Sequence, residues 1–250
     1  MKSQSFTGIS GAVLKWTAII TMFIDHFALA VYYTALHNDF TIHTNYSQHY
    51  EIMRNIGRTA FPIFIFLLIE GYKHTKDAKK YMIRLIIFAL VSEIPFDLAF
   101  HNKVWYPEKQ NIFFTLLIGF IVIHSIEQFK TLIHSHISSS YTLPAIEVLA
   151  YAGLIAIGCA AGYYLKVDYS YVGILAICIA WLLRDKPVIG IVLCCFSLLL
   201  SSKRELYSFI AILPIIIYNG KRGKQNKFFF YIFYPVHLMV FWGIEKIFIL

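Results

Sequence analysis

Charged residues are scarce in this sequence. Aspartate, glutamate, lysine and arginine together make up 14% of its 250 residues, whereas a typical soluble domain contains about 25%. Polar linkers and low-complexity tracts are also missing between the apolar runs, so we expect residues 1–250 to form one domain. This scarcity of charge excludes an ordinary soluble domain as the fold class.

Metal-binding motifs and a disulfide framework are lacking as well. Three histidines precede the second apolar run with a six-residue spacing that fits no compact metal motif, so we expect solvated side chains at His37, His43 and His49 and no bound metal. The four cysteines lie inside apolar segments, with spacings of neither a zinc site nor a disulfide framework. We expect them to serve as small packing residues at Cys159, Cys178, Cys194 and Cys195.

Long apolar runs dominate what is present. Hydrophobic residues make up 58% of the chain, and its mean hydropathy is +0.64. A membrane-spanning helix needs about 17–25 predominantly apolar residues, and runs of this kind recur along the whole length. We therefore predict an all-α, polytopic membrane helix bundle with about nine spans, of which the seventh and eighth are short and either re-entrant or embedded in protein. The predicted spans are 12–36, 54–72, 79–100, 111–129, 145–165, 169–183, 187–201, 204–219 and 227–249.

The loop cations predict the orientation. The first apolar stretch lacks a small-residue cleavage site and continues into Asp25 and His26, so we expect a retained first helix. With the N-terminus in the cytoplasm, twelve lysines and arginines fall on the inner side and six on the outer side. Inner loops of membrane proteins are enriched in such residues, so the net charge of +8 reflects topology and does not indicate a nucleic-acid partner.

Ionisable residues inside the spans are the candidate functional residues, because each costs about 2.5–3.5 kcal/mol to insert. Lys15 and His26 are eleven residues apart, which places them on one helix face about 16 Å apart along the axis. Asp25 lies on an adjacent face and can reach a neighbouring helix. The structural alternatives are that Lys15 extends to the headgroups and that His26 makes an interhelical packing hydrogen bond.

A four-charge cluster is expected at the depth of His26. Arg54 and Arg58 are one turn apart at the start of the second predicted span, and Glu93 and Asp97 are one turn apart at the end of the third. These groups either shape a substrate site or form a structural ion-pair network.

Cations gather at the opposite, predicted cytoplasmic, end. Lys15 and Arg84 lie deeper in their spans than topology requires, and a deep cationic vestibule suits a phosphate-bearing ligand. The segment "YNGKRG" adds Lys221 and Arg222, either as phosphate ligands or as topology-setting cations on a glycine-rich turn.

This layout favours transfer from a cytoplasmic donor to an acceptor at the other face, with His26 as general base or acyl carrier. A carboxylate can fix the tautomer of such a histidine. We predict Asp25 as its catalytic partner, although Asp25 can instead hold Arg58 while another group orients His26. In "FYPVHL", Pro235 is expected to break the last helix beside His237, either lining a cavity or merely bending the helix.

Several long strings resemble the TraX family, in the order of that family and over nearly the whole chain. They are "LKWTAIITMFIDH", "RNIGRTAFPIFIFLLIEGYKHT", "KKYMIRLIIFALVSEIPFDLAF", "NIFFTL", "VDYSYVGIL", "YNGKRG" and "FYIFYPVHL". The resemblance implies a multi-pass protein of the bacterial cytoplasmic membrane, of a family linked to N-terminal acetylation of conjugative pilin. Many members of that family outside plasmids have no assigned substrate.

The chain is more broadly similar to transmembrane acyltransferases of the acyltransferase-3 type. Their first helix carries a basic residue, ten intervening residues and a histidine thought to be catalytic, which Lys15 and His26 match. A basic motif early in their third helix, which binds acyl-CoA, is more loosely matched by Lys80 and Arg84 in "KKYMIR". No soluble acceptor-binding domain is apparent beyond the last predicted span, so the resemblance names no acceptor.

We therefore predict an O- or N-acetyltransferase that is surrounded by membrane lipids and uses acetyl-CoA. Its acceptor is a peptide, glycan or lipid at or across the membrane. The predicted catalytic residues are His26 and Asp25. The predicted donor-binding residues are Lys15, Lys80, Arg84, Lys221 and Arg222, and the predicted acceptor-side residues are Arg58, Glu93, Asp97 and His237. The alternatives are a proton-coupled transporter that uses the same groups as a relay and a non-enzymatic component of a conjugation or secretion complex.

Overall fold

The structure, a computed structural model, describes residues 8–34, 45–136, 143–224 and 227–248. Every regular element in these ranges is a helix, which confirms the all-α part of the predicted fold class. The elements are α1 (Gly11–Phe27), the π-helix η1 (Ala28–Tyr32), α3 (Asn45–Gly57), α4 (Ala60–Lys73), α5 (Ala78–His101), α6 (Ile112–His136), α7 (Leu143–Tyr164), α8 (Ser170–Leu182), α9 (Pro187–Leu198), the 3₁₀-helix η2 (Lys203–Ala211), α10 (Ile212–Ile216) and α11 (Lys227–Phe248).

Four helical stretches in the described part of the chain are long and apolar enough to cross a membrane, namely Gly11–Tyr32, Ser47–Lys73, Ile112–Ser135 and Pro144–Tyr164. The predicted spans at 169–183, 187–201 and 204–219 are helical but short. With 13 and 12 residues, α8 and α9 extend about 20 Å each, less than the roughly 30 Å hydrocarbon core. The count of nine spans is therefore not confirmed.

Helix α4 lies at the centre of the bundle. It contacts α1, α6, α8, α9 and η2, and Ile63, Ile65, Phe66 and Leu68 are all buried in the main apolar core. A helix that is apolar around its whole circumference requires such a central place.

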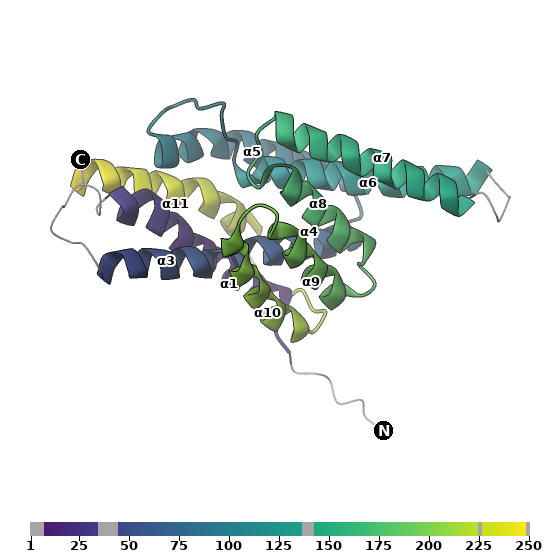
Figure 1. Cartoon of the computed structure of the whole chain (residues 1–250), viewed down its shortest axis with the longest axis horizontal. Coiled ribbons are helices and arrows are strands. Elements are labelled where there is room, and N and C mark those ends of the chain that lie inside the picture. Colours follow the sequence, from purple (N-terminus) through teal and green to yellow (C-terminus); the bar gives the residue numbers. More distant parts are fainter. Residues whose placement is uncertain (1–7, 35–44, 137–142, 225–226, 249–250) are drawn as a thin grey trace, which may run out of the picture.

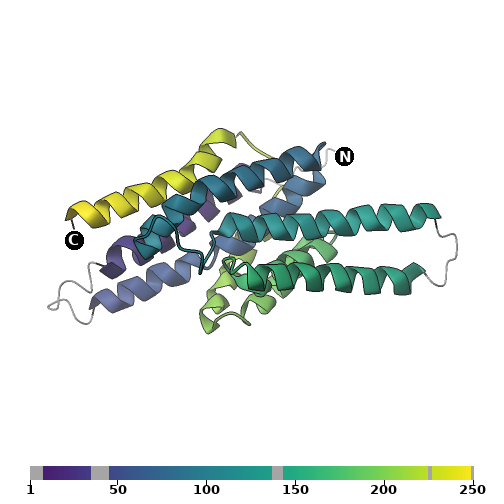
Figure 2. The same cartoon turned by 90° about the horizontal axis from the view of Figure 1, so that it is seen from above.

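The remaining helices surround α4 unevenly. In both views, α6 and α7 form a hairpin that extends beyond the other helices (Figure 1 and Figure 2). The outer face of α7 is exposed, with 66% of Val148, 73% of Leu149 and 69% of Ile157 accessible. Such a face is suited to hydrocarbon rather than to water.

Breaks in the helices converge on one region. Arg58 lies in the turn between α3 and α4 and contacts both Tyr169, in the loop before α8, and Glu205 in η2. The loop before α6 pairs with the loop before α8 through backbone hydrogen bonds between Gln110 and its partners Lys166 and Asp168. Non-helical backbone within a membrane protein is tolerated where protein buries it or where it lines a cavity.

The "YNGKRG" segment anchors the start of α1. The Ile9 amide donates to the Ile217 carbonyl at 2.8 Å, and the Gly11 amide donates to the Lys221 carbonyl at 2.8 Å. Gly223 has a φ of +72°, and a Cβ there would lie 2.4 Å from the Ser10 Oγ. This turn therefore sets where α1 begins.

The expected break at Pro235 is wrong. Helix α11 runs from Lys227 to Phe248 and contains Pro235 in its interior. Proline removes one amide donor from a helix, and the loss of a single hydrogen bond leaves α11 continuous here.

Candidate functional site

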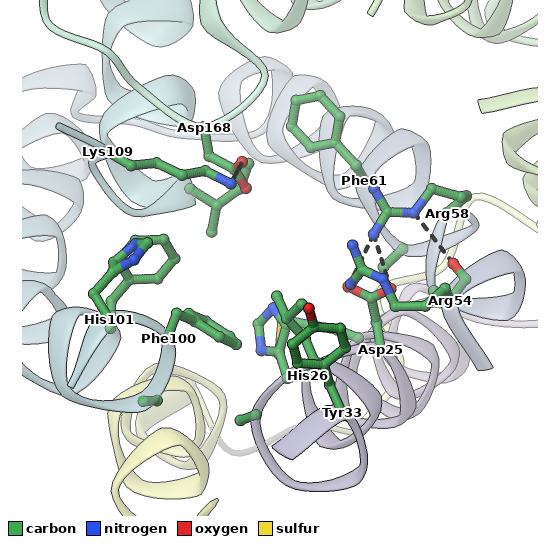
Figure 3. A pocket seen from close by; sticks show the side chains of 18 of the residues that line it. Asp25, His26, Tyr33, Arg54, Arg58, Phe61, Phe100, His101, Lys109 and Asp168 are labelled. Carbon is green, nitrogen blue, oxygen red and sulfur yellow. Dashed lines mark hydrogen bonds and ion pairs between the residues drawn. The ribbon is translucent and has the colours of Figure 1, made fainter. Parts of the chain in front are cut away.

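A cavity of about 510 Å³ lies where the helix breaks converge. Figure 3 shows His26 on one side of it, the Arg54 and Arg58 guanidinium groups on another, and Lys109 with Asp168 across from them. Side chains from α1, η1, α3, α4 and α5 line it together with the loops before α6 and α8. We call it the histidine cavity.

Asp25 is held by two arginines. Arg54 Nη1 donates to Asp25 Oδ2 at 2.7 Å, and Arg58 Nη2 donates to Asp25 Oδ1 at 2.8 Å. The side chains of all three residues are at most 14% exposed. Asp25 therefore organises the arginines of α3 and of the turn after it, as the second sequence-based interpretation anticipated, and another group contacts His26.

Gly57 makes this ion-pair group possible. A Cβ at position 57 would lie 2.3 Å from the Cβ and Oδ1 of Asp25. The missing side chain lets α1 approach α3 closely enough for one carboxylate to reach Arg54 and Arg58.

Arg58 also ties the cavity wall to two more elements. Its Nη1 donates to Glu205 Oε1 at 3.1 Å and to the Tyr169 hydroxyl at 3.2 Å. Tyr169 stacks on Phe61 with ring centroids 4.1 Å apart. Tyr169 and Ser170 have φ values of 60° and 50°, and such left-handed conformations of non-glycine residues concentrate at functional sites.

The expected cluster of Arg54, Arg58, Glu93 and Asp97 is divided in two. Glu93 accepts hydrogen bonds from the backbone and side-chain amides of Asn111, and Asp97 accepts one from the Tyr106 amide at 2.7 Å. Both carboxylates are buried and hold the loop of residues 102–111 rather than lining the cavity. Their role in acceptor binding stays a prediction. In such a role, Glu93 and Asp97 would act through this loop.

The loop held by Glu93 and Asp97 brings a cation to the cavity. Lys109 Nζ lies 3.3 Å from Asp168 Oδ1, and both residues line the wall. Lys109 and Asp168 therefore face Arg54 and Arg58 across the space beside His26 (Figure 3).

His26 contacts a second histidine. Its Nδ1 lies 2.8 Å from His237 Nε2, and the planes of the two rings are within 5° of parallel. His237 is 4% exposed and lies outside the wall of the histidine cavity. The structure thus places His237 against His26 rather than at the wall where an acceptor would bind, and its predicted acceptor role is untested.

A second cavity, of about 630 Å³, lies at the start of α1. We call it the basic cavity. Four of the five predicted donor-binding residues line it, namely Lys15, Lys80, Arg84 and Arg222. Lys221 instead contributes its backbone to the turn that anchors α1.

Lys15 and Lys80 reach the basic cavity in different ways. The Lys15 Nζ lies 4.8 Å from the centre of the Phe230 ring, which fits a cation–π contact. Lys80 lies in the first turn of α5. Its backbone amide donates to Oδ1 of Asp77, the N-cap residue of that helix, at 2.9 Å. This hydrogen bond lowers the pKa of the Asp77 carboxyl by stabilising its charged form.

The walls of the two cavities come close together along α4 and α11. Phe64 lines the histidine cavity and Leu67 lines the basic cavity, although they are only about 4.5 Å apart along α4. Tyr231 lines the basic cavity and stacks on Phe88 with centroids 4.4 Å apart. Tyr234, one turn further along α11, packs edge-on against His26.

Several residues of the cavity wall are not among the predicted site residues. Lys109, Asp168 and Tyr169 lie in loops, where no helical periodicity marks a face. A usable signal was the placement of charged residues immediately before the apolar runs that begin at 111 and 169.

Within the described ranges, no group of three or more histidine, cysteine, aspartate and glutamate side chains is arranged to hold a metal ion. His37 and His43 lie outside the described residues, so the expectation for them is untested. The cysteines lie in α7, α8 and α9 as free thiols.

The apolar helices and the two polar cavities define the class of protein, a helical membrane protein with a cavity near each end of its first helix. The sequence model of the family described as "TraX protein" matches residues 10–245. The chain therefore belongs to the TraX family.

The chain is also similar to one curated protein. The chain is 26% identical over 248 residues to the "Probable fimbrial assembly protein FimC, serogroup H1" of Dichelobacter nodosus, covering 90% of this chain and 91% of that protein. No solved structure matches this chain.

Proposed function

We propose that this protein is an integral-membrane acyltransferase that moves an acetyl group from cytoplasmic acetyl-CoA to an amine or hydroxyl group of a peptide, glycan or lipid. One observation carries the proposal. A single helix, α1, places Lys15 in the wall of a basic cavity and His26 in the wall of a separate polar cavity.

The basic cavity suits the donor. Lys15, Arg84 and Arg222 line it with Lys80, and clustered cations bind phosphate groups through charge-assisted hydrogen bonds. The abundance of lysine and arginine around this end supports a cytoplasmic placement, which is the side on which acyl-CoA is available. The slender pantetheine arm would then extend from the basic cavity toward His26.

The histidine cavity suits the acceptor. There His26 either takes a proton from the acceptor nucleophile or carries the acetyl group itself. In either sequence the acceptor gains the acetyl group, the thioester C–S bond breaks and the thiol of CoA is released. The guanidinium groups of Arg54 and Arg58 lie in the same wall and would stabilise negative charge that develops on the thioester oxygen.

The family and the similar protein indicate the cellular system in which the protein acts. Membership of the TraX family and the likeness to a protein named for fimbrial assembly support a role in a pilus or conjugation system of the bacterial cytoplasmic membrane. A pilus or fimbrial subunit is therefore the first acceptor to test, followed by exported glycans and lipids.

A transporter is the second candidate, and the short separation of the two cavity walls along α4, between Phe64 and Leu67, favours it. The two cavities lie near opposite ends of α1, as two gated compartments of a transporter would. This function requires passage of a substrate without chemical change, so a covalent product separates the two candidates.

The test compares cells that lack the gene with cells that express the wild-type chain, His26→Ala or His124→Ala. His124 is a matched control, because it bonds to the Tyr72 hydroxyl at 2.9 Å and lies outside the walls of both cavities. Mass spectrometry of surface peptides, glycans and lipids should show an acetyl mass difference with the wild type and the control. The same product with His26→Ala at equal protein abundance would overturn the proposal.

A further inference from the structure

The hydrogen bonds behind His26 form a chain with a defined direction. His237 Nδ1 lies 2.8 Å from the Phe233 carbonyl oxygen, and His237 Nε2 lies 2.8 Å from His26 Nδ1. A carbonyl oxygen can only accept a hydrogen bond, so His237 Nδ1 carries the proton in the first of these contacts.

The first contact determines the second. A neutral imidazole has one protonated nitrogen, so the Nε2 of neutral His237 is an acceptor and His26 Nδ1–H donates to it. The Nε2 of neutral His26 then holds a lone pair. The opposite direction would require a doubly protonated His237, a cation on a residue that is 4% exposed and packed among aromatic rings, and burying such a charge is costly.

Aromatic packing keeps both rings in this arrangement. Phe233 stacks on His237 with centroids 4.9 Å apart. Phe100 and Tyr234 pack edge-on against His26 at 5.2 and 5.8 Å. A flip of either imidazole ring would break this chain of hydrogen bonds. The neighbouring aromatic rings restrict such a rotation.

We propose that His237 is a positioning residue that keeps the proton of His26 on Nδ1 and so makes Nε2 the reactive atom. This inference rests on the proposed acyltransferase function and deepens it. In the base-catalysed step, the acceptor proton moves to His26 Nε2 while the acceptor lone pair forms the bond to the thioester carbon. The C–S bond then breaks, and the thiolate of CoA takes up the proton from Nε2.

The same geometry stabilises the charged intermediate. When His26 is doubly protonated, its Nδ1–H still donates to His237, and His237 still donates to the Phe233 carbonyl. Hydrogen bonds that involve an ionised group are stronger than neutral ones, so the chain favours the charged form of His26 that arises during transfer.

Two substitutions separate positioning from packing. His237→Phe keeps a ring of similar size but removes the acceptor, whereas His237→Gln places an amide oxygen near the position of Nε2. The assay combines membranes, radiolabelled acetyl-CoA and the cell fraction that becomes labelled in the presence of wild-type membranes. We expect His237→Phe to lower kcat about 100-fold or more, with a nearly unchanged KM for acetyl-CoA. His237→Gln should recover at least a tenth of the wild-type rate, and His124→Phe should match the wild type.

The tautomer itself is measured by ¹⁵N NMR of histidine-labelled protein in lipid, with the His26 signals assigned by comparison with His26→Gln. We expect a protonated Nδ1 and an unprotonated Nε2 in the wild type, and a mixture of tautomers in His237→Phe. A wild-type His26 protonated on Nε2, or full kcat in His237→Phe, would overturn the inference. If wild-type membranes transfer no label, the acyltransferase proposal fails, and the NMR spectrum still decides the role of His237.

Discussion

The Asp25 carboxylate lies between two guanidinium groups at the edge of the histidine cavity. Removing its charge by Asp25→Asn leaves Arg54 and Arg58 with an uncompensated positive charge in a region that is at most 14% exposed. Breaking a buried ion pair by removing one partner costs about 3–5 kcal/mol. We therefore expect Asp25→Asn to lower the free energy of unfolding by several kcal/mol, measured by denaturant titration in detergent.

The control for Asp25→Asn is Glu51→Gln. Glu51 also pairs with an arginine, Arg204, at 2.8 Å, but its side chain is 50% exposed. Exposed pairs contribute little to stability, so this variant should unfold close to the wild type. Equal unfolding curves for the two variants would contradict the structural role given to Asp25.

Gly57→Ala tests the close approach of α1 to α3. The added methyl group would lie 2.3 Å from Asp25 atoms, and overpacking of this kind typically costs about 1–3 kcal/mol. We expect a lower melting temperature and reduced acyl transfer. Gly153→Ala, which adds the same methyl group where no atom lies within 4 Å, should leave both measurements unchanged.

Some residue roles could be predicted from the sequence, and others could not. Lys15 and His26 were placed on one face by helical periodicity, and both contact α11 in the structure. The partner of His26 could not be predicted, because His237 lies 211 positions away and the packing of α11 against α1 is a tertiary event. Gly57 carries no local signal for the same reason, since its importance depends on what approaches it.

Among the elements, the loop of residues 102–111 connects α5 to the cavity wall. Asn111 holds this loop. Its Nδ2 donates to the Ala89 carbonyl at 2.8 Å and to Glu93, and its Oδ1 accepts from the Phe113 amide at 2.9 Å. Buried polar groups that lose their partners cost about 1–3 kcal/mol each.

Asn111→Ala should therefore loosen this loop while the helices stay folded. The expected result is faster hydrogen exchange at residues 102–111 and weaker binding of the acceptor, with the exchange of α4 unchanged. Gln110→Ala removes only an exposed side-chain contact to the Pro107 carbonyl at 3.3 Å and serves as the control. Slow exchange of the loop in Asn111→Ala would show that Glu93 and Asp97 do not need Asn111 to hold it.

Element types were more predictable than element lengths. Apolar runs indicated a helix at every predicted span, but the helices at 170–182, 187–198 and 203–216 are too short to cross the hydrocarbon core on their own. Hydropathy reports burial in protein and burial in lipid alike. Whether a short apolar helix spans the membrane or packs inside the protein therefore depends on its neighbours.

At the scale of the whole molecule, two cavities near opposite ends of α1 predict a specific response to acetyl-CoA. A ligand that binds only the folded state at 100 times its Kd stabilises it by about 2.7 kcal/mol. We expect acetyl-CoA to raise the melting temperature of the wild type in detergent. Lys15→Gln and Arg84→Gln, which alter the basic cavity, should each require a higher acetyl-CoA concentration for the same shift.

Lys221→Gln is the control for this titration and also tests a sequence-based prediction. Its backbone anchors α1, while the walls of the basic cavity are formed by other residues. The variant should respond to acetyl-CoA like the wild type. If Lys221→Gln loses as much of the response as Arg84→Gln, Lys221 binds the donor as the sequence predicts. If the wild type does not respond to acetyl-CoA, the donor is not acetyl-CoA.

Acetyl transfer in membranes that contain the wild type or His26→Ala at equal abundance decides whether His26 catalyses the reaction. Membranes are incubated with acetyl-CoA labelled in the acetyl group, and covalently bound label is counted after removal of the nucleotide. We predict label in an acceptor with the wild type and a loss of about 100-fold or more with His26→Ala. Equal labelling by the two would show that acyl transfer does not proceed at this imidazole.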